Sequence, residues 1–195
     1  NQYESDLHFL VRHTPLPPPK TAVILQGYQD AFINKQWRFL QQNILSGIRT
    51  TADNIKEIAL FIIGIAAFVS GDPETAKNFH STLLENLKND PVKRNNISPI
   101  YGRVKKFLAD ELSVIALQKY YISNDIQSAL TITEEALKLV PNNYGTLLNK
   151  ALYLFELGKI NEAKMIVKML RKMNKTHALP DSAWLYSEAF LLFFE

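Results

Sequence analysis

Two groups of basic residues are the most prominent candidates for recognition chemistry in this chain. The first group is Arg103, Lys105 and Lys106, and the second is Lys164, Lys168 and Lys172, whose four-residue spacing places them on one side of a helix. Clustered lysine and arginine can contact phosphates or acidic partners. A stripe of this kind is more often simply a solvated helix surface. Few aromatic residues are interleaved with these charges, so stacking on nucleobases has little support.

Catalytic chemistry has weaker candidates. The four histidines, at positions 8, 13, 80 and 177, form no helical metal-ligand pair, and the seven glycines are dispersed rather than gathered in a phosphate loop. The carboxylate pairs Asp110-Glu111 and Glu134-Glu135 are adjacent on predicted helices, so their side chains point in different directions. We therefore predict no catalytic residue, no metal site and no cofactor, and expect any enzymatic activity to lie in a domain outside this chain.

Composition indicates a chain that folds around a hydrophobic core. Of 195 residues, 47% are hydrophobic, which is enough to bury a core, and the net charge is only +3. The absence of cysteine excludes disulfides, and we expect a cytoplasmic location. The most apolar run, Ile58 to Val69, is shorter than the roughly 20 residues of a membrane span, so we interpret it as a buried helix.

The first 20 residues differ from the rest. Leu7, Phe9 and Val11 alternate with polar residues, and a proline cluster follows at positions 15 and 17–19. Such a cluster favours an extended polyproline segment. We expect residues 1–20 to form a linker or the tail of an upstream domain, or alternatively an arm lying on the helices. The start without methionine and the end after an apolar run suggest a piece of a multidomain protein.

From Thr21 onward the pattern predicts helices separated by short breaks. The breaks contain glycine, asparagine or proline, for example Gly71-Asp72-Pro73, Ser123-Asn124-Asp125 and Gly158-Lys159. Loops of only a few residues make neighbouring helices pack antiparallel. The chain is therefore expected to be all-α, with an extended proline-rich N-terminal segment.

A 34-residue period links these breaks. Asn124 and Gly158 are 34 residues apart, and each is followed five residues later by alanine, Ala129 or Ala163. With Tyr120 before the turn, Ala136 in the second helix and Pro141 at its end, the segment resembles the tetratricopeptide repeat family. The resemblance implies an α-solenoid of antiparallel helical hairpins, each dependent on its neighbours for burial.

The repeat units are predicted at 57–91, 110–143 and 144–177, with the first helix of a further unit at 181–195. Together they form an array over 57–195. A hairpin at 21–56 is expected to be helical, and is either a degenerate repeat or merely helical. The third unit departs from the family pattern, with Leu170 where a second alanine would stand. Gly71 and Asn124 are 53 residues apart, which is 19 more than the 34-residue period. We expect this insertion to lengthen the helix that enters Asp110.

In this family the first helices line a concave groove that receives a helix or peptide. Carried onto this sequence, the groove would be mostly apolar. Its predicted lining is Phe61, Ile65, Phe68, Val114, Gln118, Tyr121, Leu148, Asn149, Leu152 and Phe155. The N-terminal helix around Tyr28, Phe32 and Trp37 could instead fill the groove. A clamp for a C-terminal carboxylate is not expected, because apolar residues such as Ile115 occupy places that require basic or polar ones.

These observations favour a non-catalytic protein-protein interaction module, acting as the docking or sensor region, or scaffold, of a larger protein. Two alternatives stay open. One is a regulator that binds a peptide signal through polar groove residues such as Gln118 and Asn149. The other is a nucleic-acid accessory protein that uses the basic clusters. The sequence predicts neither the identity of the partner nor the oligomeric state.

Overall fold

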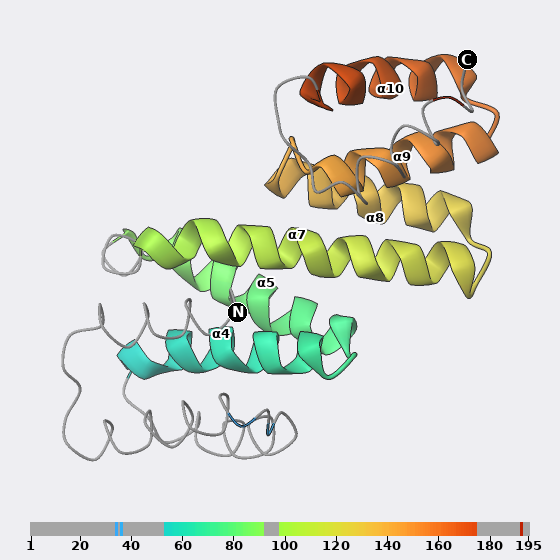
Figure 1. Cartoon of the computed structure of the whole chain (residues 1–195). Coiled ribbons are helices and arrows are strands. Elements are labelled where there is room, and N and C mark those ends of the chain that lie inside the picture. The colour runs from blue at the N-terminus through green and yellow to red at the C-terminus, as the bar shows by residue number, and fades with distance from the viewer. Residues whose placement is uncertain (1–33, 35, 37–52, 92–97, 175–191, 193–195) are drawn as a thin grey trace. The chain divides into compact units, whose positions relative to one another are not determined.

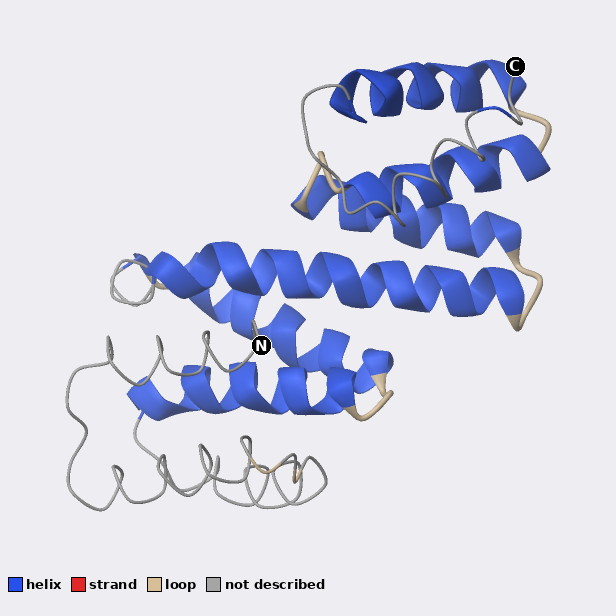
Figure 2. Cartoon of the chain, viewed as in Figure 1, coloured by secondary structure: helices blue, strands red, loops and turns tan. Residues whose placement is uncertain are grey.

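The computed structural model describes residues 34, 36, 53–91, 98–174 and 192. These residues form helices joined by short turns, and no strand occurs among them (Figures 1 and 2). The predicted all-α class is thus confirmed for this part of the chain. The predictions for 1–20, and nearly all of those for 21–56 and 181–195, concern residues outside this part. By compactness the chain divides into two units, Asn1–Glu111 and Leu112–Glu195, which are considered separately.

The N-terminal unit is built on a hairpin of α4 (Asp53–Val69) and α5 (Pro73–Asn89). Gly71 turns the chain with a φ of 90°, a backbone conformation that glycine adopts without steric cost. The Asp72 carboxylate then accepts a hydrogen bond from the Thr75 amide at 3.1 Å, which caps α5. The apolar run in α4 is buried from Leu60 to Ala67, and Phe61, Ile62 and Ile63 are each at most 2% exposed. Val69, at its end, is 40% exposed.

The C-terminal unit contains the end of α7 (Ser98–Tyr121), α8 (Ile126–Leu139), α9 (Tyr144–Glu156) and α10 (Ile160–Asn174). Their small and aliphatic side chains form one core cluster around Ala116, Ala129, Leu147, Ala151 and Val167. The Asp125 carboxylate caps α8 by accepting from the Ser128 amide at 3.0 Å, and hydrogen bonds from Ser128 lower the pKa of Asp125.

The same turn geometry recurs in three hairpins. Gly71, Asn124 and Gly158 have positive φ values of 90°, 52° and 74°. Each lies two or three residues after the end of the first helix of its hairpin. Five residues after each of these positions the chain has an alanine with 0% exposure. The three alanines are Ala76, Ala129 and Ala163. A small side chain at this position lets the two helices of a hairpin approach closely.

Helix α7 is the longest of the described helices, with 24 residues. The lengthening predicted from the insertion before Asp110 is therefore observed. Its first turn contains Pro99, a position where the missing amide hydrogen leaves no helical bond unmade. Residues of α7 up to Glu111 belong to the N-terminal unit, and those from Leu112 belong to the C-terminal unit.

Candidate functional site

In the C-terminal unit, α7 and α9 lie side by side and run in the same direction. The hydroxyl groups of Ser113 and Thr146 are 2.8 Å apart, and the rings of Tyr120 and Tyr153 have centroids 5.0 Å apart. Both contacts join residues 33 positions apart in the sequence, so moving forward along α7 also moves forward along α9. Equivalent side chains of the two helices therefore repeat with nearly the same period as the turns.

A half-exposed, mostly apolar stripe follows each of these two helices. On α7 it contains Val114, Gln118 and Tyr121, and on α9 it contains the residues 34 positions later, Leu148, Leu152 and Phe155. The spacing i, i+4, i+7 keeps each set on one side of its helix. Gln118 is exposed and Tyr121 is 72% exposed, while the others are half-buried. We refer to these six residues and Asn149 as the first-helix face.

The first-helix face combines apolar area with two side-chain amides. Leu148, Leu152 and Phe155 pack partly against the core cluster, which fixes the inner part of each side chain. The amides of Gln118, exposed, and Asn149, half-buried, can both donate and accept hydrogen bonds. An apolar strip with a few hydrogen-bonding groups is the usual composition of a peptide-binding surface.

The predicted groove residues of the N-terminal unit are placed differently. Phe61 and Ile65 are buried, with 1% and 2% exposure, and Phe68 is half-buried. The Phe61 ring packs edge-on against Phe107 at 5.6 Å between centroids. Phe61 and Ile65 are thus core residues of this unit in the present structure, and the candidate site is restricted to the first-helix face.

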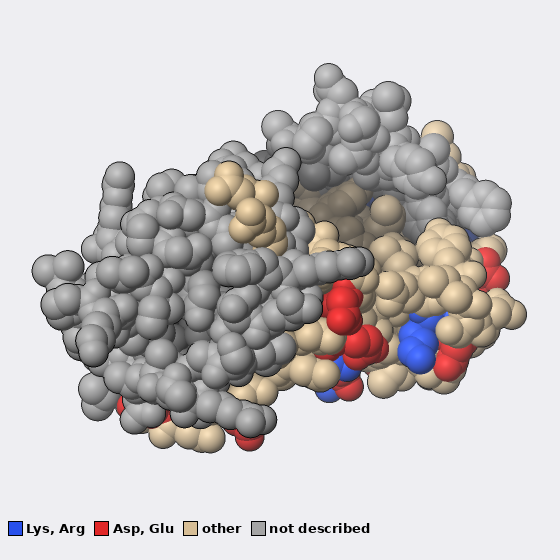
Figure 3. Space-filling model, turned by 90° about the horizontal axis from the view of Figure 1, so that it is seen from below, with Lys and Arg blue, Asp and Glu red and all other residues tan. Residues whose placement is uncertain are grey.

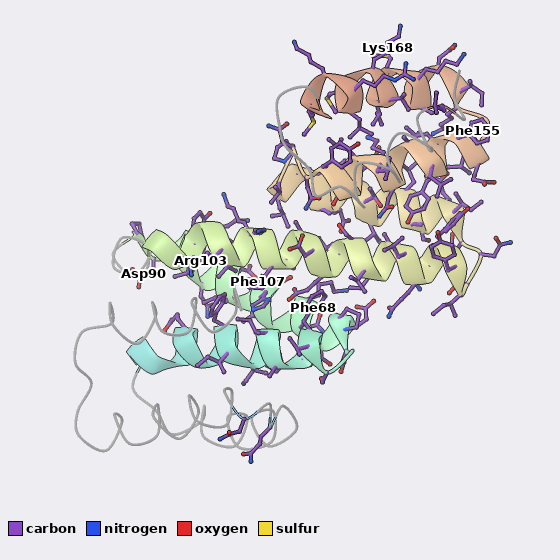
Figure 4. The ribbon with its side chains drawn as sticks, in the orientation of Figure 1. Phe68, Asp90, Arg103, Phe107, Phe155 and Lys168 are labelled. Atoms are coloured by element: carbon purple, nitrogen blue, oxygen red, sulfur yellow. The ribbon has the colours of Figure 1, made fainter. Side chains whose placement is uncertain are left out.

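The two basic groups also differ. Arg103 and Lys105 are half-buried, and the Lys105 ammonium lies 4.6 Å from the centroid of the Tyr101 ring, a cation–π contact. Two residues apart on a helix, Arg103 and Lys105 point in nearly opposite directions, so with Lys106 they form no single patch. Lys164, Lys168 and Lys172 are all exposed, and Lys168 projects from the side of α10 that faces away from α9 (Figure 4).

Charge is mixed elsewhere on the described surface. The face shown in Figure 3 carries both acidic and basic side chains among uncharged residues. One ion pair, from Lys150 to Glu134 at 2.9 Å, links α9 to α8. Such a partly exposed pair adds little stability but orients the Lys150 side chain.

A buried histidine–glutamate pair in the N-terminal unit is the main feature that sequence reasoning missed. His80 of α5 and Glu111 of α7 are both 0% exposed, and His80 Nδ1 lies 2.5 Å from Glu111 Oε1. The other ring nitrogen, Nε2, lies 3.1 Å from the carbonyl oxygen of Phe61 in α4. The imidazole ring therefore joins three helices, and the ring of Phe107 lies beside it.

The hydrogen bonds fix how many protons this pair holds. The Phe61 carbonyl can only accept, so His80 Nε2 must carry a hydrogen. One further proton must lie between Nδ1 and Oε1 for that contact to be a hydrogen bond. The pair is then neutral as a whole. Burial raises the pKa of Glu111, and the hydrogen bond from His80 acts in the opposite direction.

The complete burial of His80 and Glu111 indicates that this pair has a structural role. Neither side chain reaches the surface, and the second carboxyl oxygen of Glu111 is buried with no hydrogen-bond partner among the described residues. The internal repeat offers a signal that could have revealed the pair. His80 stands four residues after Ala76, where the other two hairpins have Thr133 and Val167.

Within 53–91 and 98–174, no group of three or more histidine, aspartate or glutamate side chains could hold a metal ion. None of the helices described for this chain combines the length and apolar character needed to cross a bilayer. No protein-family model matches the sequence, and no curated protein matches it either.

Proposed function

We propose that this chain is a non-catalytic interaction module of the tetratricopeptide-repeat type, and that its first-helix face binds a helix or an extended peptide of a partner protein. The observation that carries the proposal is the repeated stripe on α7 and α9. Six side chains stand in a 34-residue register on two parallel helices, five of them apolar or aromatic and none charged.

The chemistry of the partner follows from that face. Tyr121, at 72% exposure, is a rigid amphipathic side chain of the kind that dominates binding energy in interfaces. The half-buried Leu152 can be covered by apolar side chains of a partner at little entropic cost, since the core already restricts it. The amides of Gln118 and Asn149 suit the polar groups that accompany such a segment. The partner is therefore an amphipathic segment with apolar side chains at helical spacing.

The test is a selection of random peptides on the full chain, followed by affinity measurements. We expect the selected peptides to share apolar residues at i, i+3 or i+4, and to lose at least about tenfold in affinity on Leu152→Glu. Tyr121→Ala should weaken binding similarly without touching the core. The matched control is Thr131→Glu, which places the same charge on an exposed position of α8. Peptides that bind all of these proteins equally well would overturn the proposal.

A second comparison addresses the sequence-based alternative in which the N-terminal helix occupies the groove. Residues 21–52 belong to this alternative and lie, apart from positions 34 and 36, outside the described residues. If that segment competes for the first-helix face, a chain that begins at Asp53 will bind the selected peptides more tightly than the full chain. Equal affinity would show that the N-terminal segment does not occupy this face.

A further inference from the structure

Helix α10 exposes apolar side chains that the other second helices do not. Met165 is 72% exposed and Met169 is 40% exposed, and their four-residue spacing makes them neighbours on the helix surface. By contrast, α5 and α8 carry no exposed large hydrophobic side chain among the residues that the structure describes. The outer surface of α10 is thus distinct from the surfaces of its two counterparts.

Because the hairpins repeat, positions of α10 can be compared one by one with those of α8 and α5. Counting from the buried alanine of each hairpin, Met165 corresponds to Thr131 in α8 and to Asn78 in α5. Met169 corresponds to Glu135 and to Thr82 in the same way. All four counterparts are exposed and polar, so hairpin packing at these two positions is compatible with a polar residue. Packing within the hairpin therefore does not explain the two methionines.

Three exposed lysines border the methionines. Lys164 and Lys168 directly precede Met165 and Met169 in the sequence, and Lys172 continues their row one turn further. None of the three forms an ion pair with another residue in the described part of the chain. One acidic residue, Glu162, lies in the first turn of α10. We call the two methionines and three lysines the methionine–lysine face.

We propose that the methionine–lysine face is a second docking surface, separate from the first-helix face, for an acidic amphipathic segment of a partner protein. Methionine side chains are flexible and polarisable and can adapt to different apolar side chains. The lysine row supplies positive charge beside them, which complements aspartate or glutamate flanking those side chains. Charge complementarity and the paired methionines together define the partner.

Other polyanions fit this face less well. A nucleic acid would use the lysines but gain nothing from exposed methionines, and the face has no aromatic side chain for stacking. An anionic membrane surface is usually met by a wider apolar face with large aliphatic or aromatic residues than two methionines provide.

The test uses the full chain and four probes of stated composition. The first is an 18-residue peptide with leucine at i, i+4 spacing and glutamate at flanking positions, and the second is a scrambled peptide of equal composition. The third is vesicles of phosphatidylcholine with phosphatidylserine, and the fourth is a 20-base-pair DNA duplex. The uncharged double variant Met165→Asn, Met169→Thr has the residues that stand at the equivalent positions of α5, Asn78 and Thr82. The triple variant Lys164→Gln, Lys168→Gln, Lys172→Gln removes the charge, and Met165→Leu, Met169→Leu is the apolar control.

We expect the patterned peptide to bind at low salt more tightly than the scrambled one. Binding should fall at least about tenfold in the polar methionine variant and in the lysine variant, and should persist in the leucine control. Absence of binding, binding insensitive to the methionines, or preferred binding of vesicles or duplex would each overturn the inference. If Leu152→Glu abolishes binding of this peptide, the segment uses the first-helix face instead, and the present inference fails while the proposed function stands.

Discussion

At the scale of single residues, the contact between Gly64 and His80 fixes how α4 and α5 pack. A Cβ atom placed on Gly64 would lie 2.6 Å from ring carbons Cδ2 and Cε1 of His80. The ring cannot shift freely, because its nitrogens are hydrogen-bonded to Glu111 and to the Phe61 carbonyl. The absence of a side chain at position 64 is thus required by the histidine that faces it.

Gly64→Ala should therefore destabilise the protein by about 1 to 3 kcal/mol, the usual cost of inserting a carbon atom into a filled core. The measurement is the free energy of unfolding from urea titration. Gly102→Ala is the matched control, since Gly102 lies in α7 with open space around its Cβ position. That control should stabilise the protein by up to about 1 kcal/mol through helix propensity. Equal effects of the two substitutions would contradict the account of this contact.

Glu111 gives a prediction about pH. Because burial raises its pKa above the ordinary value of 4.5, the folded state holds the proton more tightly than the unfolded state does. The resulting stabilisation is complete below the unfolded pKa and is lost as the pH rises through the folded pKa. Glu111→Gln keeps an acceptor for the histidine but has no such dependence.

The stability of Glu111→Gln relative to the wild-type protein should thus increase from pH 5 to pH 8. Urea midpoints of both proteins at the two pH values provide the measurement. A constant difference across this range would mean that Glu111 titrates alike in the folded and unfolded states. A decreasing difference would mean that the carboxylate form is the one stabilised by folding.

At the scale of helices and turns, the left-handed residues at Gly71, Asn124 and Gly158 set the hairpin connections. At the end of α9 the Lys159 amide donates to the Leu154 carbonyl at 2.8 Å, which closes the helix across Gly158. The geometry requires a positive φ at position 158, where alanine is disfavoured.

Gly158→Ala should destabilise the protein by about 1 to 2 kcal/mol, the cost of a left-handed conformation for a residue with a side chain. Thermal or urea unfolding measures the effect. Gly145→Ala serves as the control, because Gly145 is helical and its added Cβ would meet only the Asn143 side-chain oxygen at an ordinary 3.8 Å. We expect the control to be neutral or stabilising. A neutral Gly158→Ala would show that the connection adapts readily.

The turns and helix ends were the features that sequence predicted best. Gly71, Asn124 and Gly158 were recognised from residue type and spacing alone, because few residues tolerate a left-handed backbone. The burial of the three equivalent alanines followed from the same register. Sequence does not show how deeply each side of a helix is buried: Phe61 and Ile65, predicted to line a groove, are 1% and 2% exposed.

The features missed are those that depend on contacts distant in the sequence. His80 and Glu111 are 31 residues apart, and neither has a local pattern that indicates a partner. The exposed methionines of α10 have the residue type of a core position, and only comparison with Thr131 and Glu135 shows that they are unusual. Residue type and period predicted the elements, whereas packing between elements decided which side chains are available for binding.

At the scale of the whole molecule, composition and contacts are consistent with the proposal that this chain acts by binding a partner. The net charge of +3 provides no strong field for nucleic acid, and the candidate surfaces of the C-terminal unit are a mostly apolar face on first helices and a basic face on a second helix. If both proposals hold, this unit has two surfaces of different chemistry. One would bind an apolar helix or peptide, and the other would bind an acidic segment.

The central claim is that the first-helix face binds an amphipathic segment, and hydrogen–deuterium exchange of the full chain tests it most directly. Exchange would be compared with and without a saturating peptide from the selection described above. The account predicts slower exchange in 114–121 and 148–155, with α8 unchanged. Slower exchange confined to other helices, with these two segments unaffected, would contradict it.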